Sequence, residues 1–80
     1  MRDIRYRPTW EDDIAGYDFV ALDGNTRIGR VVIWPAGSWE VRWSWASWFP
    51  GLPNVGYHPS MREAMLELEA RYAAYLEKQG

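Results

Sequence analysis

One stretch of this sequence restricts the fold more than any other, because apolar and polar side chains alternate strictly between residues 39 and 45. The apolar positions are Trp39, Val41, Trp43 and Trp45, and the positions between them are Glu40, Arg42 and Ser44. A period of two places alternate side chains on opposite faces of a β-strand. The stretch therefore predicts a strand with one aromatic face in the core and one polar face toward water.

The neighbouring residues predict that this strand is the third of an antiparallel meander over residues 17–45. Residues 17–22 are rich in aromatic and branched side chains, which are typical of strands. The segment Asp23-Gly24-Asn25-Thr26 tolerates the positive φ of a tight hairpin, so residues 27–34 should run back along the first strand. Residues 35–38 contain a proline and a glycine and supply the second turn.

The second strand carries apolar residues on both faces, as a central strand does. Strict alternation groups Ile28, Arg30, Val32 and Trp34 on one face and Arg27, Gly29, Val31 and Ile33 on the other. We expect the face of Val31 to point toward a helix. The opposite face then carries Arg30 and Trp34 beside Arg42 of the third strand, and this partly apolar surface is the first candidate for partner binding.

An amphipathic helix is predicted over residues 60–78. The segment Ser60-Met61-Arg62-Glu63 matches a capping box, in which the Ser60 side chain accepts from the Glu63 amide and the Glu63 side chain reaches back to the Ser60 amide. The apolar residues recur at intervals of three and four and are Met61, Ala64, Met65, Leu68, Tyr72, Tyr75 and Leu76. Packed on the tryptophan face, this helix gives an α+β fold, an antiparallel sheet of three to four strands with one C-terminal helix on one face.

The first fourteen residues have a weaker pattern. Apolar and basic side chains alternate over residues 4–7, which predicts an edge strand that Pro8 ends. Residues 9–12 follow as a turn, although they also resemble a short capped helical turn. A strand at this end would be the fourth of the sheet.

Residues 46–59 are predicted to form a loop, because their three prolines and two glycines exclude a long helix or a central strand. Trp48 and Phe49 lie near its start. Such an aromatic pair either folds back over the core as a lid or presents an anchor to a partner. We expect the whole chain, residues 1–80, to form a single domain.

No group of residues predicts catalysis or cofactor binding. The chain has no cysteine and a single histidine, His58, so a metal site would need carboxylates at a spacing that the sequence lacks. Glu11-Asp12-Asp13 is expected to be a solvated acidic turn, and Ser60 is explained as a helix cap rather than a nucleophile. We therefore predict a protein that is not an enzyme and holds no cofactor and no metal.

Charge and composition favour a protein partner over a nucleic acid. The formal charge is −2 at pH 7, which argues against a generally basic nucleic-acid binder. Eight of the nine positive residues are arginine, which suits bidentate and stacked contacts, although a GC-rich coding sequence gives the same bias. The lack of cysteine fits a reducing compartment, and no stretch approaches the ~20 apolar residues of a membrane span. We expect a soluble, cytoplasmic protein.

A wider pattern of strand, turn and cap residues covers about two-thirds of the chain. It consists of Tyr17, Asp23-Gly24, Ile28-Gly29-Arg30-Val31, Trp43-x-Trp45, Gly56 and Ser60-x-x-Glu63-Ala64. In this pattern the chain resembles short open reading frames of bacteria and their phages, from which it departs by a more aromatic segment at Trp48-Phe49. The resemblance implies a meander with a C-terminal helix and an origin in a mobile element, and it transfers no catalytic residues.

These observations leave three functions open. The leading hypothesis is a non-enzymatic protein-binding module, a phage or prophage inhibitor of a host system such as CRISPR interference. Its expected partner-binding residues are Arg30, Trp34, Arg42, Trp48 and Phe49. The alternatives are an RNA- or single-stranded-DNA-binding domain and a homodimer joined through the edge strand at residues 4–7.

Two local features bear on these alternatives. Arg30 and Arg42 could instead form cross-strand ion pairs with Glu40 or Asp18, which would make them structural. The N-terminal arginines at positions 2, 5 and 7 are interleaved with Tyr6, as basic and aromatic residues often are in segments that bind nucleic acid.

Overall fold

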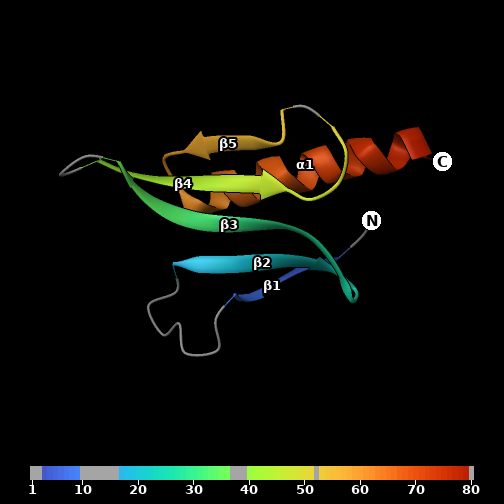
Figure 1. Cartoon of the computed structure of the whole chain (residues 1–80), viewed down its shortest axis with the longest axis horizontal. Coiled ribbons are helices and arrows are strands. Elements are labelled where there is room, and N and C mark those ends of the chain that lie inside the picture. Colours follow the sequence, from blue (N-terminus) through green and yellow to red (C-terminus); the bar gives the residue numbers. More distant parts are fainter. Residues whose placement is uncertain (1–2, 10–16, 37–39, 52, 80) are drawn as a thin grey trace.

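The computed structural model describes residues 3–9, 17–36, 40–51 and 53–79. Over these residues the chain forms a five-stranded antiparallel sheet with one helix on one face, which confirms the predicted α+β fold (Figure 1). Each strand pairs with the next one along the chain. The elements are β1 (Ile4–Pro8), β2 (Asp18–Asp23), β3 (Thr26–Ala36), β4 (Glu40–Ser47), β5 (Val55–His58) and α1 (Met61–Gln79).

The first two predicted hairpin strands form with the expected turn between them. Gly24 lies in this turn with a φ of 62°, a conformation that residues with a side chain rarely adopt. β3 continues through Pro35, beyond the predicted end of the strand. Because β2 begins opposite Val32, the last part of β3 pairs with β4 alone, and a proline is tolerated at such an edge. The rest of the predicted second turn, residues 37 and 38, lies outside the described residues.

The helix and the adjacent strands enclose the core. Trp45, Val31 and Leu68 are the largest side chains that are almost fully buried. All seven residues of the predicted helical stripe are buried in this cluster or packed against it: Met61, Ala64, Met65, Leu68, Tyr72, Tyr75 and Leu76. The predicted pairing of this stripe with the tryptophan face is confirmed for Trp43 and Trp45, and Trp39 lies outside the described residues.

The N-terminus of α1 is capped by the Ser60 side chain as predicted, although among the described residues the Glu63 side chain does not accept the predicted return bond from the Ser60 amide. The Ser60 Oγ accepts a hydrogen bond of 3.2 Å from the Glu63 amide, and the Ser60 carbonyl accepts one of 3.2 Å from the Ala64 amide. The first bond satisfies an amide that has no carbonyl partner within the helix, and the second is the first bond of the helical ladder. The cap therefore fixes where β5 gives way to the helix.

The loop predicted for residues 46–59 contains strand residues that the sequence analysis missed. β4 continues to Ser47, and Val55–His58 forms β5 at the edge of the sheet. An edge strand needs a ladder partner on one side only, so prolines on either flank do not exclude it. Gly56 also permits this pairing, because a Cβ atom at position 56 would collide with the indole of Trp45.

A β-bulge changes which residues of β3 face the helix. Ala21 pairs with Gly29, whereas the next residue, Leu22, pairs with Arg27, so the register shifts between them. Ile28 consequently joins the core cluster, and Arg27 shares the opposite face of the sheet with Leu22. Strict alternation predicts the reverse for Ile28 and Arg27, and for these two residues that prediction is wrong.

The helix lies over β3, β4 and β5 rather than across the whole sheet (Figure 1). Two tyrosines connect it to the other two strands. The Tyr6 hydroxyl of β1 donates to Glu69 Oε2 at 2.7 Å, and the Tyr72 hydroxyl of α1 donates to Asp23 Oδ2 at 2.5 Å. Burial, and then the neighbouring Glu69 carboxylate, raise the pKa of Tyr6 well above its ordinary value.

Candidate functional site

The sheet face opposite the helix is the candidate site, and we name it the open face. No element of the described part of the chain packs against it. Val20 and Leu22 belong to this face and are nevertheless buried, with exposed fractions of 5% and 8%, although neither belongs to the core cluster. Their cover must therefore come from something other than the helix.

Arginines flank both of these aliphatic residues in the cross-strand register. The two rows are Arg5, Leu22, Arg27 and Arg7, Val20, Arg30, each running from β1 through β2 to β3. Arginine covers apolar surface with its methylene stem while its guanidinium stays in water. Arginines at these positions can shield the two aliphatic residues with their stems and keep their charged groups in water.

Among the arginines of these two rows, Arg30 forms an ion pair with a described residue. Its Nε donates to Asp18 Oδ1 at 2.8 Å and its Nη2 donates to Asp18 Oδ2, and the Thr9 hydroxyl donates to Oδ1 at 2.6 Å. The bond to Asp18 raises the pKa of Arg30. This confirms Asp18 as its cross-strand partner. Arg30 thus holds the buried Asp18 carboxylate in place. The Arg30 side chain is 38% exposed, and its contact with an external partner stays a prediction.

The other arginines of the two rows surround a hollow of about 630 Å³. Arg5, Arg7 and Arg27 line it together with Leu22 and the turn residues Gly24 and Asn25, and we name it the arginine hollow. None of the lining residues is acidic. The basic residues of β1 are apparent from the sequence, whereas the place of Arg27 is not, because the bulge that puts it beside Leu22 depends on pairing between separate strands.

Exposed apolar side chains lie at the other side of the open face, on β5 and at the end of β4. Trp48, Val55 and Tyr57 are 52%, 46% and 52% exposed, and we name them the aromatic patch. Tyr57 lies opposite Ser44, which points away from the helix. The Trp48 amide donates to the Ile28 carbonyl at 2.9 Å and extends the ladder, so alternation places Trp48 on the open face.

Phe49 points the other way, so the two aromatic residues of the predicted pair have different roles. Its ring lies 5.3 Å from the Tyr72 ring and 5.1 Å from the Tyr75 ring, centroid to centroid. Phe49 therefore closes the core beside the helix, whereas Trp48 faces solvent. Phe49 thus folds back over the core, whereas a role for Trp48 as an anchor for a partner stays a prediction.

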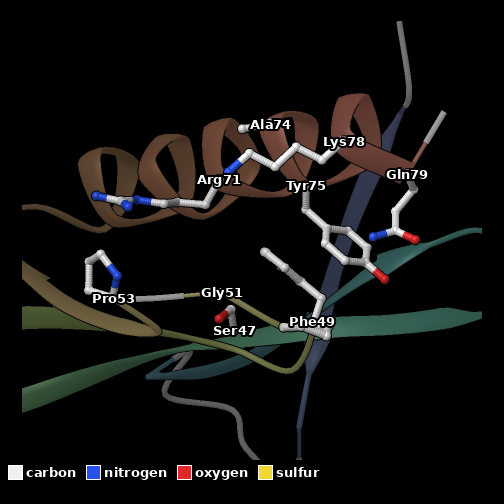
Figure 2. Close-up of a pocket in the computed structure, with 10 residues that line it drawn as sticks. Ser47, Phe49, Gly51, Pro53, Arg71, Ala74, Tyr75, Lys78 and Gln79 are labelled. Carbon is white, nitrogen blue, oxygen red and sulfur yellow. The ribbon is translucent and has the colours of Figure 1, made fainter.

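A second hollow, of about 320 Å³, lies between the segment after β4 and the C-terminal half of α1. Figure 2 shows Phe49 and Tyr75 at one end of it and Arg71 and Lys78 along the helix. The Arg71 Nε donates to Glu67 Oε2 at 2.9 Å, and its guanidinium lies 5.7 Å from the centroid of the Trp45 ring. Arg71 is thus engaged in packing the helix on the sheet.

Two predicted contact residues lie far from the arginine hollow. Trp34 pairs with Arg42 through the backbone near the end of β3, whereas Arg27 is near its start. Arg42 is exposed. The side chain of Trp34 lies outside the described residues. The structure thus brings Arg42 near neither Arg5 nor Arg7.

Among the described residues, no group of three His, Cys, Asp or Glu could hold a metal ion. His58 is on the helix side, where its Nε2 lies 3.8 Å from Glu67 Oε1. Within the same residues, no helix is long and apolar enough to cross a membrane.

Comparisons with protein-family models, with curated proteins and with solved structures find no match for this chain.

Proposed function

We propose that the chain is a small, non-enzymatic protein-binding module that docks its partner through the open face. The observation that carries this proposal is the exposure of the aromatic patch, Trp48, Val55 and Tyr57, beside arginines on a face without a second layer. Tryptophan, tyrosine and arginine are the residue types that most often dominate the binding energy of protein interfaces.

The rest of the open face also suits docking. Ser44 and Ala46 lie between the aromatic patch and β3, and their small side chains leave room for a partner's side chains beside Tyr57. The backbone beneath them is held by ladders on both sides. A partner would therefore meet a surface that loses little conformational entropy on binding.

The resemblance to short bacterial and phage reading frames supports a host protein as the partner. On this proposal the chain is an inhibitor that acts by occupying a surface of a host system such as CRISPR interference. Docking alone would be sufficient for inhibition, so the proposal requires no catalytic group.

Capture of proteins from a bacterial host lysate tests the docking surface. We expect the tagged wild-type chain to retain one specific partner, and a Trp48→Ala/Tyr57→Ala variant to lose it. Leu66→Ala is the matched control, because Leu66 is 51% exposed but belongs to the helix. Equal capture by the double variant, or no captured partner at all, would count against the proposal.

A single-stranded nucleic acid is the second candidate, because the open face combines arginines with the exposed rings of Trp48 and Tyr57. Aromatic rings stack on bases, and arginines pair with phosphates. An electrophoretic mobility shift at low salt that weakens steeply as salt rises would favour it. Without such a shift, the protein-binding proposal stands alone.

A further inference from the structure

The arginine hollow is the part of the open face whose charge nothing in the described chain explains. Arg5 and Arg7 are two residues apart on β1, so their Cα atoms are about 7 Å apart. Arg27 is across β2 from Arg5, at about 10 Å by the usual strand spacing. Three like charges therefore gather around one apolar residue, Leu22, which forms part of the lining.

The neighbouring row shows what such an arginine binds when a partner is available. On the same face of the sheet, Arg30 donates hydrogen bonds to both oxygens of the Asp18 carboxylate. No ion pair or hydrogen bond within the described residues gives Arg5, Arg7 or Arg27 an equivalent acidic partner. The arginine hollow thus has the donors for two or three carboxylates and lacks the acceptors.

We propose that the arginine hollow binds carboxylates of an extended acidic segment of the partner protein. This inference rests on the proposed function and adds the chemistry of the partner's contact. An extended chain repeats its side-chain direction every second residue, so acidic residues separated by one position would match the spacing of Arg5 and Arg7. Burial of Leu22 beneath the bound segment would exclude water and strengthen each ion pair.

Charge along the rest of the open face favours carboxylates over a nucleic-acid backbone. A single strand of RNA or DNA needs a basic groove that follows several successive phosphates. Beyond the arginine hollow, Arg30 is neutralised by Asp18, and the side chains that follow toward β5 are the uncharged Val32, Ser44, Ala46, Trp48, Val55 and Tyr57. Arg42 also belongs to this face, but it lies opposite Trp34, near the other end of β3. The charges of Arg5, Arg7 and Arg27 therefore form a separate group rather than a basic groove that continues along the face.

Fluorescence polarisation with labelled hexaglutamate tests the inference at low salt. We expect hexaglutamate to bind the wild-type chain and to bind an Arg7→Gln/Arg27→Gln variant at least about tenfold more weakly, since each lost charged hydrogen bond reduces affinity several-fold. Glutamine retains part of the stem that covers Val20 and Leu22, so the variant should fold, which circular dichroism verifies. Arg62→Gln on the exposed part of α1 is the matched control and should bind as the wild type does.

Two results would overturn the inference. One is that the wild-type chain does not bind hexaglutamate, or that the double variant binds it equally well. The other is that labelled oligothymidylate binds more tightly than hexaglutamate with the same dependence on Arg7 and Arg27, which would assign the hollow to phosphates.

Different results would contradict the proposed function and this inference. If hexaglutamate does not bind but Trp48→Ala/Tyr57→Ala still abolishes capture of a host protein, the docking face stands and the acidic partner is wrong. If hexaglutamate binds at the arginines but Trp48→Ala/Tyr57→Ala leaves capture unchanged, the acidic-segment site is supported and docking through the aromatic patch is wrong.

Discussion

The two faces of the sheet are sealed in different ways, although they alternate along the same strands. The helix face is closed by a second layer, in which Leu68 of α1 meets Val31 and Trp45 at exposed fractions of 0–2%. On the open face, no second layer is present among the described residues, and Val20 and Leu22 are flanked in the register by arginines from neighbouring strands. A face sealed by another layer stabilises the fold, whereas a face sealed by arginine stems keeps its charged groups available for a partner.

The largest loss of stability is expected for Trp45→Ala, on the helix face. Removal of a fully buried indole from the helix face should lower the free energy of unfolding by about 3–5 kcal/mol, much of what a domain of this size possesses. Trp48→Ala on the open face should lower it by less than about 1 kcal/mol. Urea unfolding followed by circular dichroism measures both, and equal losses would break the comparison.

Asp18→Asn tests whether the ion pair between Asp18 and Arg30 on the open face also stabilises the fold. The substitution removes the charge that Arg30 and Thr9 bind, so we expect a loss of about 1–3 kcal/mol in the free energy of unfolding, reduced by the partial exposure of Arg30. The same urea titration detects it. A loss below about 0.5 kcal/mol would show that the ion pair contributes nothing to stability.

Tyr6→Phe sharpens the comparison at the edge where the helix does not cover the sheet. Loss of the hydroxyl bond to Glu69 should cost about 1–2 kcal/mol at neutral pH. The pKa of Tyr6 is higher in the folded state than in the unfolded state, so this stabilisation is present below about pH 10 and is lost as the pH rises further. The wild type should therefore lose more stability than Tyr6→Phe between pH 9 and 11, and parallel losses would contradict the assignment.

The smallest effect on stability is expected for Arg7→Gln/Arg27→Gln. Both side chains are exposed, and no ion pair with a described residue involves them, so each change should alter the free energy of unfolding by less than about 0.5 kcal/mol. Thermal unfolding gives this value for the variant used in the hexaglutamate experiment. A much larger loss would mean that the arginines stabilise the fold rather than bind a partner.

Local signals in the sequence predicted much of this fold. The cap at Ser60, the turn at Gly24 and the alternation through Trp43 and Trp45 each depend on a few neighbouring residues, and each is present. β5 was missed because glycine and proline locally favour a loop. It forms because Gly56 makes room for the indole of Trp45, a contact that depends on the packed sheet.

The candidate site was less predictable, because it too depends on contacts that exist only in the packed sheet. The Arg30 to Asp18 ion pair followed from simple pairing of the first two hairpin strands. The arginine hollow did not, because it requires the register of β1 on β2 and the bulge that exchanges Arg27 with Ile28. A bulge of this kind has no clear local signal, and alternation alone assigns both residues to the wrong face.

The most direct test of the open face as the binding surface is a titration of the ¹⁵N-labelled chain with hexaglutamate, followed by amide chemical shifts. Binding at the open face predicts the largest shift changes in β1, around Leu22 and in the turn from Gly24 to Arg27, with little change in α1. Changes centred instead on α1 and the hollow beside Phe49 and Tyr75 would contradict the assignment of the binding face.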